Sequence, residues 1–98
     1  MKYDLVIKEE AELDISESYQ WYESKRNGLG EKFLNFLDEY FNNILQSPTH
    51  YQERNNNRRY CPMKRFPFVI VFEIEITCIV VYAVFHTSRN PSVEESRK

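Results

Sequence analysis

Basic side chains gather at the ends of the apolar segments in the second half of the chain, and they are the residues best suited to chemistry. The set comprises Arg58, Arg59, Lys64, Arg65, His86 and Arg89. Metal-free RNA cleavage needs a base for the 2′-hydroxyl proton, an acid for the leaving oxygen and cations beside the phosphate. Arginine and lysine can stabilise the phosphate charge, and a histidine side chain can transfer either proton. The set therefore contains the residue types that RNA cleavage requires, although exposed surface charge is the commoner role for such residues.

Motifs for other chemistries are missing from the sequence. With two glycines, the chain can form neither a P-loop nor a GxGxxG turn. His50 and His86 stand alone and the cysteines lack CxxC spacing, so we expect neither a metal site nor a cofactor. Cys61 and Cys78 lie in or beside apolar runs, which predicts buried free thiols of an intracellular protein. Nothing marks a nucleophile for a Ser–His–Asp triad.

Residues 65–86 must position the basic side chains, and they form the most apolar part of the chain. In the first half, two faces alternate: Phe68, Ile70, Phe72 and Ile74 on one, and Val69, Val71, Glu73 and Glu75 on the other. In the second half, Ile79, Val81, Ala83 and Phe85 alternate with Cys78, Val80, Tyr82 and Val84. This period of two in Val, Ile and Phe predicts a β-hairpin with a turn at 75–77. The two glutamates near its middle argue against a membrane span.

Two helices and two weaker strands surround this hairpin. Helical periodicity runs from about Glu9 to the Asn27-Gly28 stop, and again from Gly30 to Ser47-Pro48. The short connection between the helices predicts an antiparallel helical hairpin. Residues 3–8 are expected to form a first strand and 49–57 a polar loop. Residues 58–64 form a weak strand, which Pro62 places at an edge or at a bulge.

These elements predict one α+β domain over residues 1–98, in the order β-α-α-β-β-β. The N-terminal strand and the helical hairpin should pack on an antiparallel sheet, which buries one face against the helices. The other face carries Val69, Val71, Val80 and Tyr82, and is more apolar than a lone domain needs. A covering partner and a curled sheet with its own small core explain this surplus equally well.

Charge is divided unevenly along the chain. Residues 1–53 contain five Lys and Arg against eleven Asp and Glu, whereas residues 54–98 contain eight against four. The asymmetry favours a face that meets phosphate or an acidic partner, although a solvated surface is its commoner cause. No signal peptide is visible at the start of the chain, so we expect a cytoplasmic protein.

Six motifs follow one another in an order typical of a known superfamily. They are A-E-L-D-I at 11–15, W-Y-E at 21–23, G-L-G-E-K-F-L at 28–34, I-L-Q-S-P at 44–48, R-F-P-F-V-I-V-F-E-I at 65–74 and V-Y-A-V-F-H-T-S-R-N-P at 81–91. The chain resembles the RelE/ParE superfamily, the toxins of type II toxin–antitoxin and plasmid-stabilisation systems. The resemblance implies a helical hairpin on an antiparallel sheet. It also implies a growth-inhibiting toxin held inactive by a cognate antitoxin, whose C-terminal segment wraps the toxin as a helix or an added strand.

The superfamily divides by target, and the resemblance leaves two targets open. RelE-like toxins cut mRNA in the ribosome, whereas ParE-like toxins poison DNA gyrase. By position, the family's basic residues correspond to Arg59, Arg65 and Arg89, and its histidine to His86; these would be catalytic only in a metal-independent mRNA endoribonuclease. Relatives commonly carry an aromatic within N-P-x-x-W, where this chain has Glu94.

The change from an aromatic to Glu94 weakens the RNase hypothesis, because a carboxylate neither stacks on a base nor tolerates phosphate. We therefore expect a ParE-like toxin that binds gyrase, with mRNA cleavage or an inactive, antitoxin-binding remnant as alternatives. The expected antitoxin- or target-binding residues are Val69, Val71, Val80, Tyr82 and Lys64.

Overall fold

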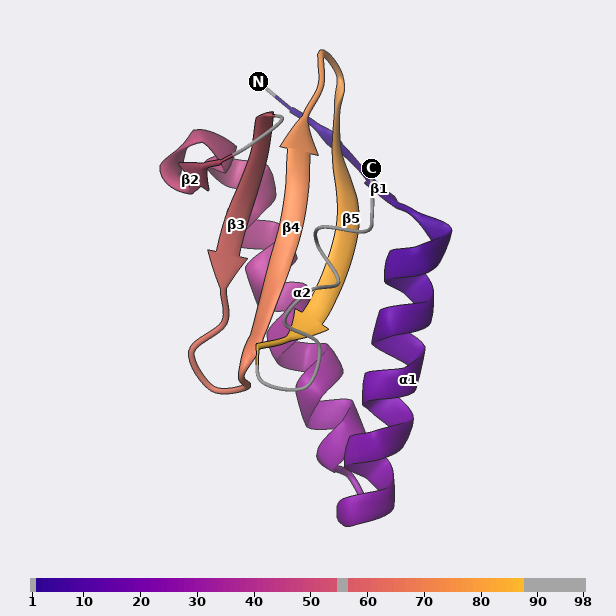
Figure 1. The fold of residues 1–98 in the computed structure, drawn as a ribbon. Coiled ribbons are helices and arrows are strands. Elements are labelled where there is room, and N and C mark those ends of the chain that lie inside the picture. Colours follow the sequence, from indigo (N-terminus) through magenta and orange to yellow (C-terminus); the bar gives the residue numbers. More distant parts are fainter. Residues whose placement is uncertain (1, 55–56, 88–98) are drawn as a thin grey trace.

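The predicted hairpin lies at the centre of a five-stranded sheet in the computed structural model, which describes residues 2–54 and 57–87 (Figure 1). The elements are β1 (Asp4–Ile7), α1 (Glu9–Lys25), α2 (Leu29–Gln46), the 3-10 helix η1 (Pro48–His50), β2 (Gln52–Glu53), β3 (Arg58–Pro62), β4 (Phe68–Ile74) and β5 (Cys78–His86). The strand order is β1-β5-β4-β3-β2, and the helices pack on one face. The α+β class, the helical hairpin and the turn at 75–77 are confirmed.

The sheet differs from expectation in two details. It is mixed, because β1 runs parallel to β5 while the other pairs are antiparallel. Parallel neighbours need a long crossover, which the two helices and three intervening strands supply. The expected loop at 49–57 contains η1 and the short strand β2, in which Gln52 and Glu53 pair with Tyr60 and Arg59. Pro62 lies beyond this pairing, on the open part of the β3 edge, as its missing N–H predicts.

The helical hairpin is joined by a turn that needs both glycines. Gly28 has a φ of 89°, a left-handed conformation that disfavours a side chain. Gly30 lies so close to α1 that an added Cβ would be 2.7 Å from the carbonyl oxygen of Tyr19. The Glu23 carboxylate accepts the N–H groups of Gly28 and Gly30 at 2.9 and 3.0 Å. Glu23 therefore caps the start of α2, where an anion also suits the helix dipole.

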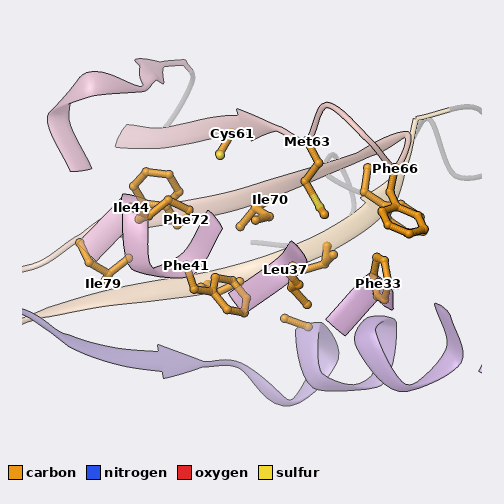
Figure 2. Packing of buried hydrophobic residues seen from close by; sticks show 14 of the residues in the cluster. Phe33, Leu37, Phe41, Ile44, Cys61, Met63, Phe66, Ile70, Phe72 and Ile79 are labelled. Atoms are coloured by element: carbon orange, nitrogen blue, oxygen red, sulfur yellow. The ribbon is translucent and has the colours of Figure 1, made fainter. Parts of the chain in front are cut away.

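The main core lies between α2 and the sheet. Figure 2 shows the buried face of α2 against residues of the strands. The helix contributes Phe33, Leu37, Phe41 and Ile44, and the sheet contributes Phe68, Ile70, Phe72, Ile79 and Val81. Phe33 also makes ring contacts with Tyr22, Phe66 and Phe68, so that α1, α2 and the sheet share one aromatic cluster. Burial of this apolar stripe holds the helices on the sheet.

A β-bulge breaks the alternation expected along β5. Val71 pairs with Ala83 but Phe72 pairs with Val81, so Tyr82 is the extra residue. Beyond it the faces exchange, and Val84 joins the main core. Ala83 and Phe85 instead join Val71 in a second buried cluster, against which Val69 and Tyr60 pack. The expectation that Ile79, Val81, Ala83 and Phe85 share one face is therefore wrong beyond Val81.

Helix α1 continues the edge of the sheet where β1 stops. Lys8 donates its N–H to the carbonyl oxygen of Val81 at 3.0 Å, which ends the pairing of β1 with β5. The remaining edge of β5 faces α1, and the Asp14 carboxylate accepts the N–H of Val84 at 3.0 Å. A helix side chain thereby satisfies a backbone group that the short strand leaves open.

None of the helices in the described part of the chain has the length and apolar character that a bilayer crossing requires.

Candidate functional site

Arg59, a candidate catalytic residue, takes part in the architecture of the sheet edge. Its guanidinium donates to the carbonyl oxygen of Tyr51 at 2.8 Å and pairs with the Glu53 carboxylate at 3.3 Å. These contacts tie the residue after η1 and strand β2 to β3. The side chain is 19% exposed, so most of its surface is already covered by its own fold. A phosphate would compete with these contacts.

Arg58 is buried and lies beside the half-buried Tyr82. Its guanidinium carbon is 4.3 Å from the centre of the Tyr82 ring, and its Nε is 3.9 Å from the Glu73 carboxylate. Burial raises the pKa of Tyr82, and the charge of Glu73 adds to this rise. Tyr82 is therefore a neutral ring that stacks with a cation at neutral pH. The expected surface role of Arg58 is not what the structure shows, because the side chain is only 9% exposed.

His86 lies at the end of β5, on the side of the sheet that faces α1. Its ring meets Phe68 edge-on, with centroids 5.2 Å apart. It lines a small cavity of about 180 Å³ together with Asp14, Glu17 and Trp21 of α1. The two carboxylates that line this cavity repel a phosphate. This environment differs from the phosphate site expected for RNA cleavage.

The structure brings together only part of the candidate catalytic set. Arg59 is level with Phe72 and His86 with Phe68 on β4, so they are about 13 Å apart along the strands and about 10 Å apart across them. Arg65 is exposed in the loop before β4, at the same end of the sheet as His86. Its guanidinium stacks on Phe36 of α2 at 5.0 Å, whereas His86 faces α1. Arg89 lies outside the described residues, as does Glu94.

The expected binding surface is less open than the sequence indicated. Val71 and Val80 are 1% and 6% exposed, and Val69 and Tyr82 are half-buried. Val71 and Val69 belong to the second cluster, so this face of the sheet has a small core. Lys64 is exposed in the loop after β3, where its N–H bonds to the Tyr40 hydroxyl at 2.9 Å. Their role in antitoxin or target binding stays a prediction.

A groove that the sequence analysis missed runs between α2 and the open edge of β3. We call it the β3–α2 groove; its volume is about 670 Å³. Its aromatic and basic lining includes Phe36, Tyr40, Arg54, Tyr60, Lys64 and Arg65. The signal in the sequence was the excess of cations after residue 53. These residues come from four separate segments, so only the fold brings them into one place.

The two thiols differ in their surroundings. Cys61 is fully buried in the main core, and burial raises its pKa from 9.0 to about 11, although a hydrogen bond with Tyr51 opposes this. A thiol of this kind is a poor nucleophile at neutral pH. Both thiols are free, but Cys78 is half-buried, whereas the sequence predicted that both would be buried. Within residues 2–54 and 57–87, His, Cys, Asp and Glu side chains form no group of three that could hold a metal ion.

The sequence matches a known protein family over most of its length. The family described as "ParE toxin of type II toxin-antitoxin system, parDE" matches residues 5–91. The chain belongs to this toxin family. A solved structure titled "Chromosomal ParDE TA system from P. aeruginosa" is 17% identical, with a TM-score of 0.77 over 87% of this chain and 96% of that one. It supports the fold alone. No protein of curated function matches the chain.

Family membership confirms the RelE/ParE resemblance, and the structure explains its motifs. Glu23 of W-Y-E caps Gly28 and Gly30 of G-L-G, and Asp14 of A-E-L-D-I accepts the N–H of Val84 in V-Y-A-V-F-H. Four of the six motifs are thus joined by hydrogen bonds inside the fold. These motif residues therefore help to specify how the toxin folds.

Proposed function

We propose that this ParE-family toxin arrests growth by binding an essential cytoplasmic target, DNA gyrase, and that a cognate antitoxin neutralises it. The observation that carries the proposal is the separation of the candidate catalytic residues. Arg59 is bonded to Tyr51 and Glu53, and His86 shares a cavity with Asp14 and Glu17 of α1. Catalysis of RNA cleavage needs its base, acid and cations around one phosphate. Action by binding, without bond cleavage, fits this arrangement better.

The antitoxin is proposed to wrap the toxin with its C-terminal segment. Half-buried Val69 and Tyr82 on the sheet, and exposed Lys64 beyond β3, are the parts of the expected binding surface that a partner can reach. Buried Val71 and Val80 would support this surface from below. An acidic segment would complement the basic half of the chain. Membership of a family of type II toxin–antitoxin systems supports an antitoxin as the partner.

A supercoiling assay tests the target. Purified toxin at micromolar excess should inhibit supercoiling of relaxed plasmid by gyrase, and addition of the antitoxin should restore it. The replacement Lys64→Glu should weaken antitoxin rescue, whereas Lys2→Glu, the same charge change near the N-terminus, should not. Unchanged supercoiling at micromolar excess would refute gyrase as the target. Growth arrest on induction, measured in parallel, separates a different target from an inactive remnant.

Ribosome-dependent mRNA cleavage is the second candidate, because Arg65 and His86 lie at the same end of the sheet. The backbone of Thr87 bonds to Pro67 there, with N···O of 2.9 Å. Primer extension on translated mRNA would then reveal new 5′ ends on induction. The double replacement His86→Ala with Arg89→Ala should remove them, and cleavage that survives it would rule out this site.

A further inference from the structure

The β3–α2 groove combines aromatic rings with cations, and this combination is informative about its ligand. Phe36 and Tyr40 line it from α2, Tyr60 from β3, and Arg54 and Lys64 from the flanking loops. Its volume of about 670 Å³ is in the range of sites that hold ligands of small-molecule size. A short segment of a flexible polymer would fit such a space, whereas a double helix would not.

The cations of the groove are not neutralised by the described part of the protein. Arg58 and Arg59 of β3 do not line the groove, and each has a carboxylate partner, at 3.9 and 3.3 Å. Arg54, Lys64 and Arg65 are exposed and form no ion pair with any described residue. Glu39 also lines the groove, so three cations face one carboxylate there. The site therefore favours an anionic ligand.

Two of the cations are held against aromatic rings. The guanidinium carbon of Arg54 is 4.4 Å from the centre of the Tyr60 ring, and that of Arg65 is 5.0 Å from the centre of the Phe36 ring. Stacking of this kind positions a guanidinium plane while its N–H edge can still bind phosphate in a bidentate way. The exposed side of a stacked guanidinium is also a platform on which a base can stack.

The backbone of the groove makes an added peptide strand a poor alternative. Pro62 has no N–H, Met63 donates its N–H to Phe68 at 2.8 Å, and Lys64 donates its own to the Tyr40 hydroxyl at 2.9 Å. Three successive residues on this edge thus offer no free donor to an incoming strand. Donors to a ligand at these positions must therefore come from side chains, and the cations of the lining supply them.

We propose that the β3–α2 groove binds a segment of single-stranded nucleic acid. Arg54, Lys64 and Arg65 contact the phosphates, and bases stack on the rings and on the guanidinium planes. This site shares Lys64 and Val69 with the surface proposed for the antitoxin, and the binding requires no cleavage. Such binding would place the toxin on an exposed single strand of nucleic acid, whichever enzyme it inhibits at that position.

Fluorescence anisotropy with labelled 12-nucleotide strands of dT and of rU tests the proposal on the purified full chain. Both should bind, with an affinity that falls as salt rises, and the ratio of the two separates DNA from RNA as the preferred source. The double replacement Arg54→Gln with Lys64→Gln should weaken binding about tenfold or more and flatten the salt dependence by about two phosphate contacts. Both side chains are exposed, so the thermal unfolding profile should stay unchanged.

Two matched controls make the test specific. Arg26→Gln removes an exposed charge at the far end of the helical hairpin and should leave the affinity within about twofold. An abasic strand of equal length and charge should bind about fivefold or more weakly, because it offers no base to stack. Equal loss with Arg26→Gln, equal binding of the abasic strand, or equal binding of polyglutamate would each overturn the proposal. So would the absence of binding at about 100 μM strand in low salt.

Discussion

The two edges of the sheet use charge in opposite ways. Along the β1–β5 edge, α1 contributes carboxylates, and Asp14 serves as a backbone acceptor for Val84. Along the β3 edge, cations lie over aromatic rings, and among the described residues Arg54 and Arg65 have no acidic partner. The Asp14 carboxylate therefore helps to hold the fold together, while Arg54 and Arg65 at the basic edge remain available to a ligand. The acidic first half and the basic second half of the sequence thus place their charges at opposite edges of the sheet.

The turn that joins α1 to α2 fixes one edge relative to the other, and breaking it should have the largest effect. In Gly30→Ala the new Cβ would meet the Tyr19 carbonyl at 2.7 Å and displace the Glu23 cap. We expect a loss of about 3 kcal/mol in the free energy of unfolding, measured by urea denaturation. Gly28→Ala, which has open space but a positive φ, should cost about 1 kcal/mol. Equal losses would mean that backbone conformation, not close contact, governs this turn.

Removal of Asp14 should weaken the acidic edge alone. The replacement Asp14→Ala leaves the Val84 N–H without its acceptor, at a cost of about 2 kcal/mol. In this variant the amide exchange rate of Val84, measured by NMR, should rise more than the exchange rates of the β3 amides. Glu17→Ala is the matched control, because Glu17 lines the same cavity and is exposed; it should change stability by less than about 0.5 kcal/mol. Fast Val84 exchange in both variants would argue against a specific role for Asp14.

The reactivity of the two thiols probes the two edges without any mutation, so the smallest effect is expected here. Cys61 lies on β3, and Cys78 pairs with Asp4 of β1. At pH 8, iodoacetamide should modify Cys78 well before Cys61, because burial raises the Cys61 pKa to about 11. The unfolded thiol loses its proton near pH 9, so the stability due to the neutral buried thiol is complete below pH 9. It is lost as the pH rises towards 11.

Unfolding curves recorded between pH 8 and pH 11 check the second part of this prediction. The decline in stability should be smaller in Cys61→Ala than in the parent chain, after allowance for the stability that the cavity removes at every pH. Labelling of Cys61 as fast as that of Cys78 in the folded protein would show that the β3 edge opens readily.

Much of the architecture could be predicted from the sequence because its signals are local. Period-two order gave β4 and the start of β5, helical stripes gave α1 and α2, and Gly28 marked their turn. The bulge at Tyr82 could not be predicted, because it depends on the register between two strands and not on either alone. The parallel pairing of β1 with β5 is likewise a choice between distant segments.

Site residues were harder to predict than helices and strands, because the sequence does not show which group a charged side chain will contact. Arg59 bonds to a backbone carbonyl of Tyr51, which no side-chain pattern encodes. His86 faces carboxylates that lie some seventy positions earlier in the chain. The β3–α2 groove draws on the helix, two loops and a strand, so its residues are scattered in the sequence.

The contact between Asp14 and Val84 also bears on how copies of this protein behave towards one another. A strand whose edge amides are free can recruit a foreign strand and seed fibrous assembly. On the second half of β5 an approaching chain would meet a helix and a carboxylate that already holds the Val84 amide. Although β1 has only four residues, the part of β5 beyond it therefore does not offer an open edge at this position. Helix α1 blocks the addition of a strand from another molecule there.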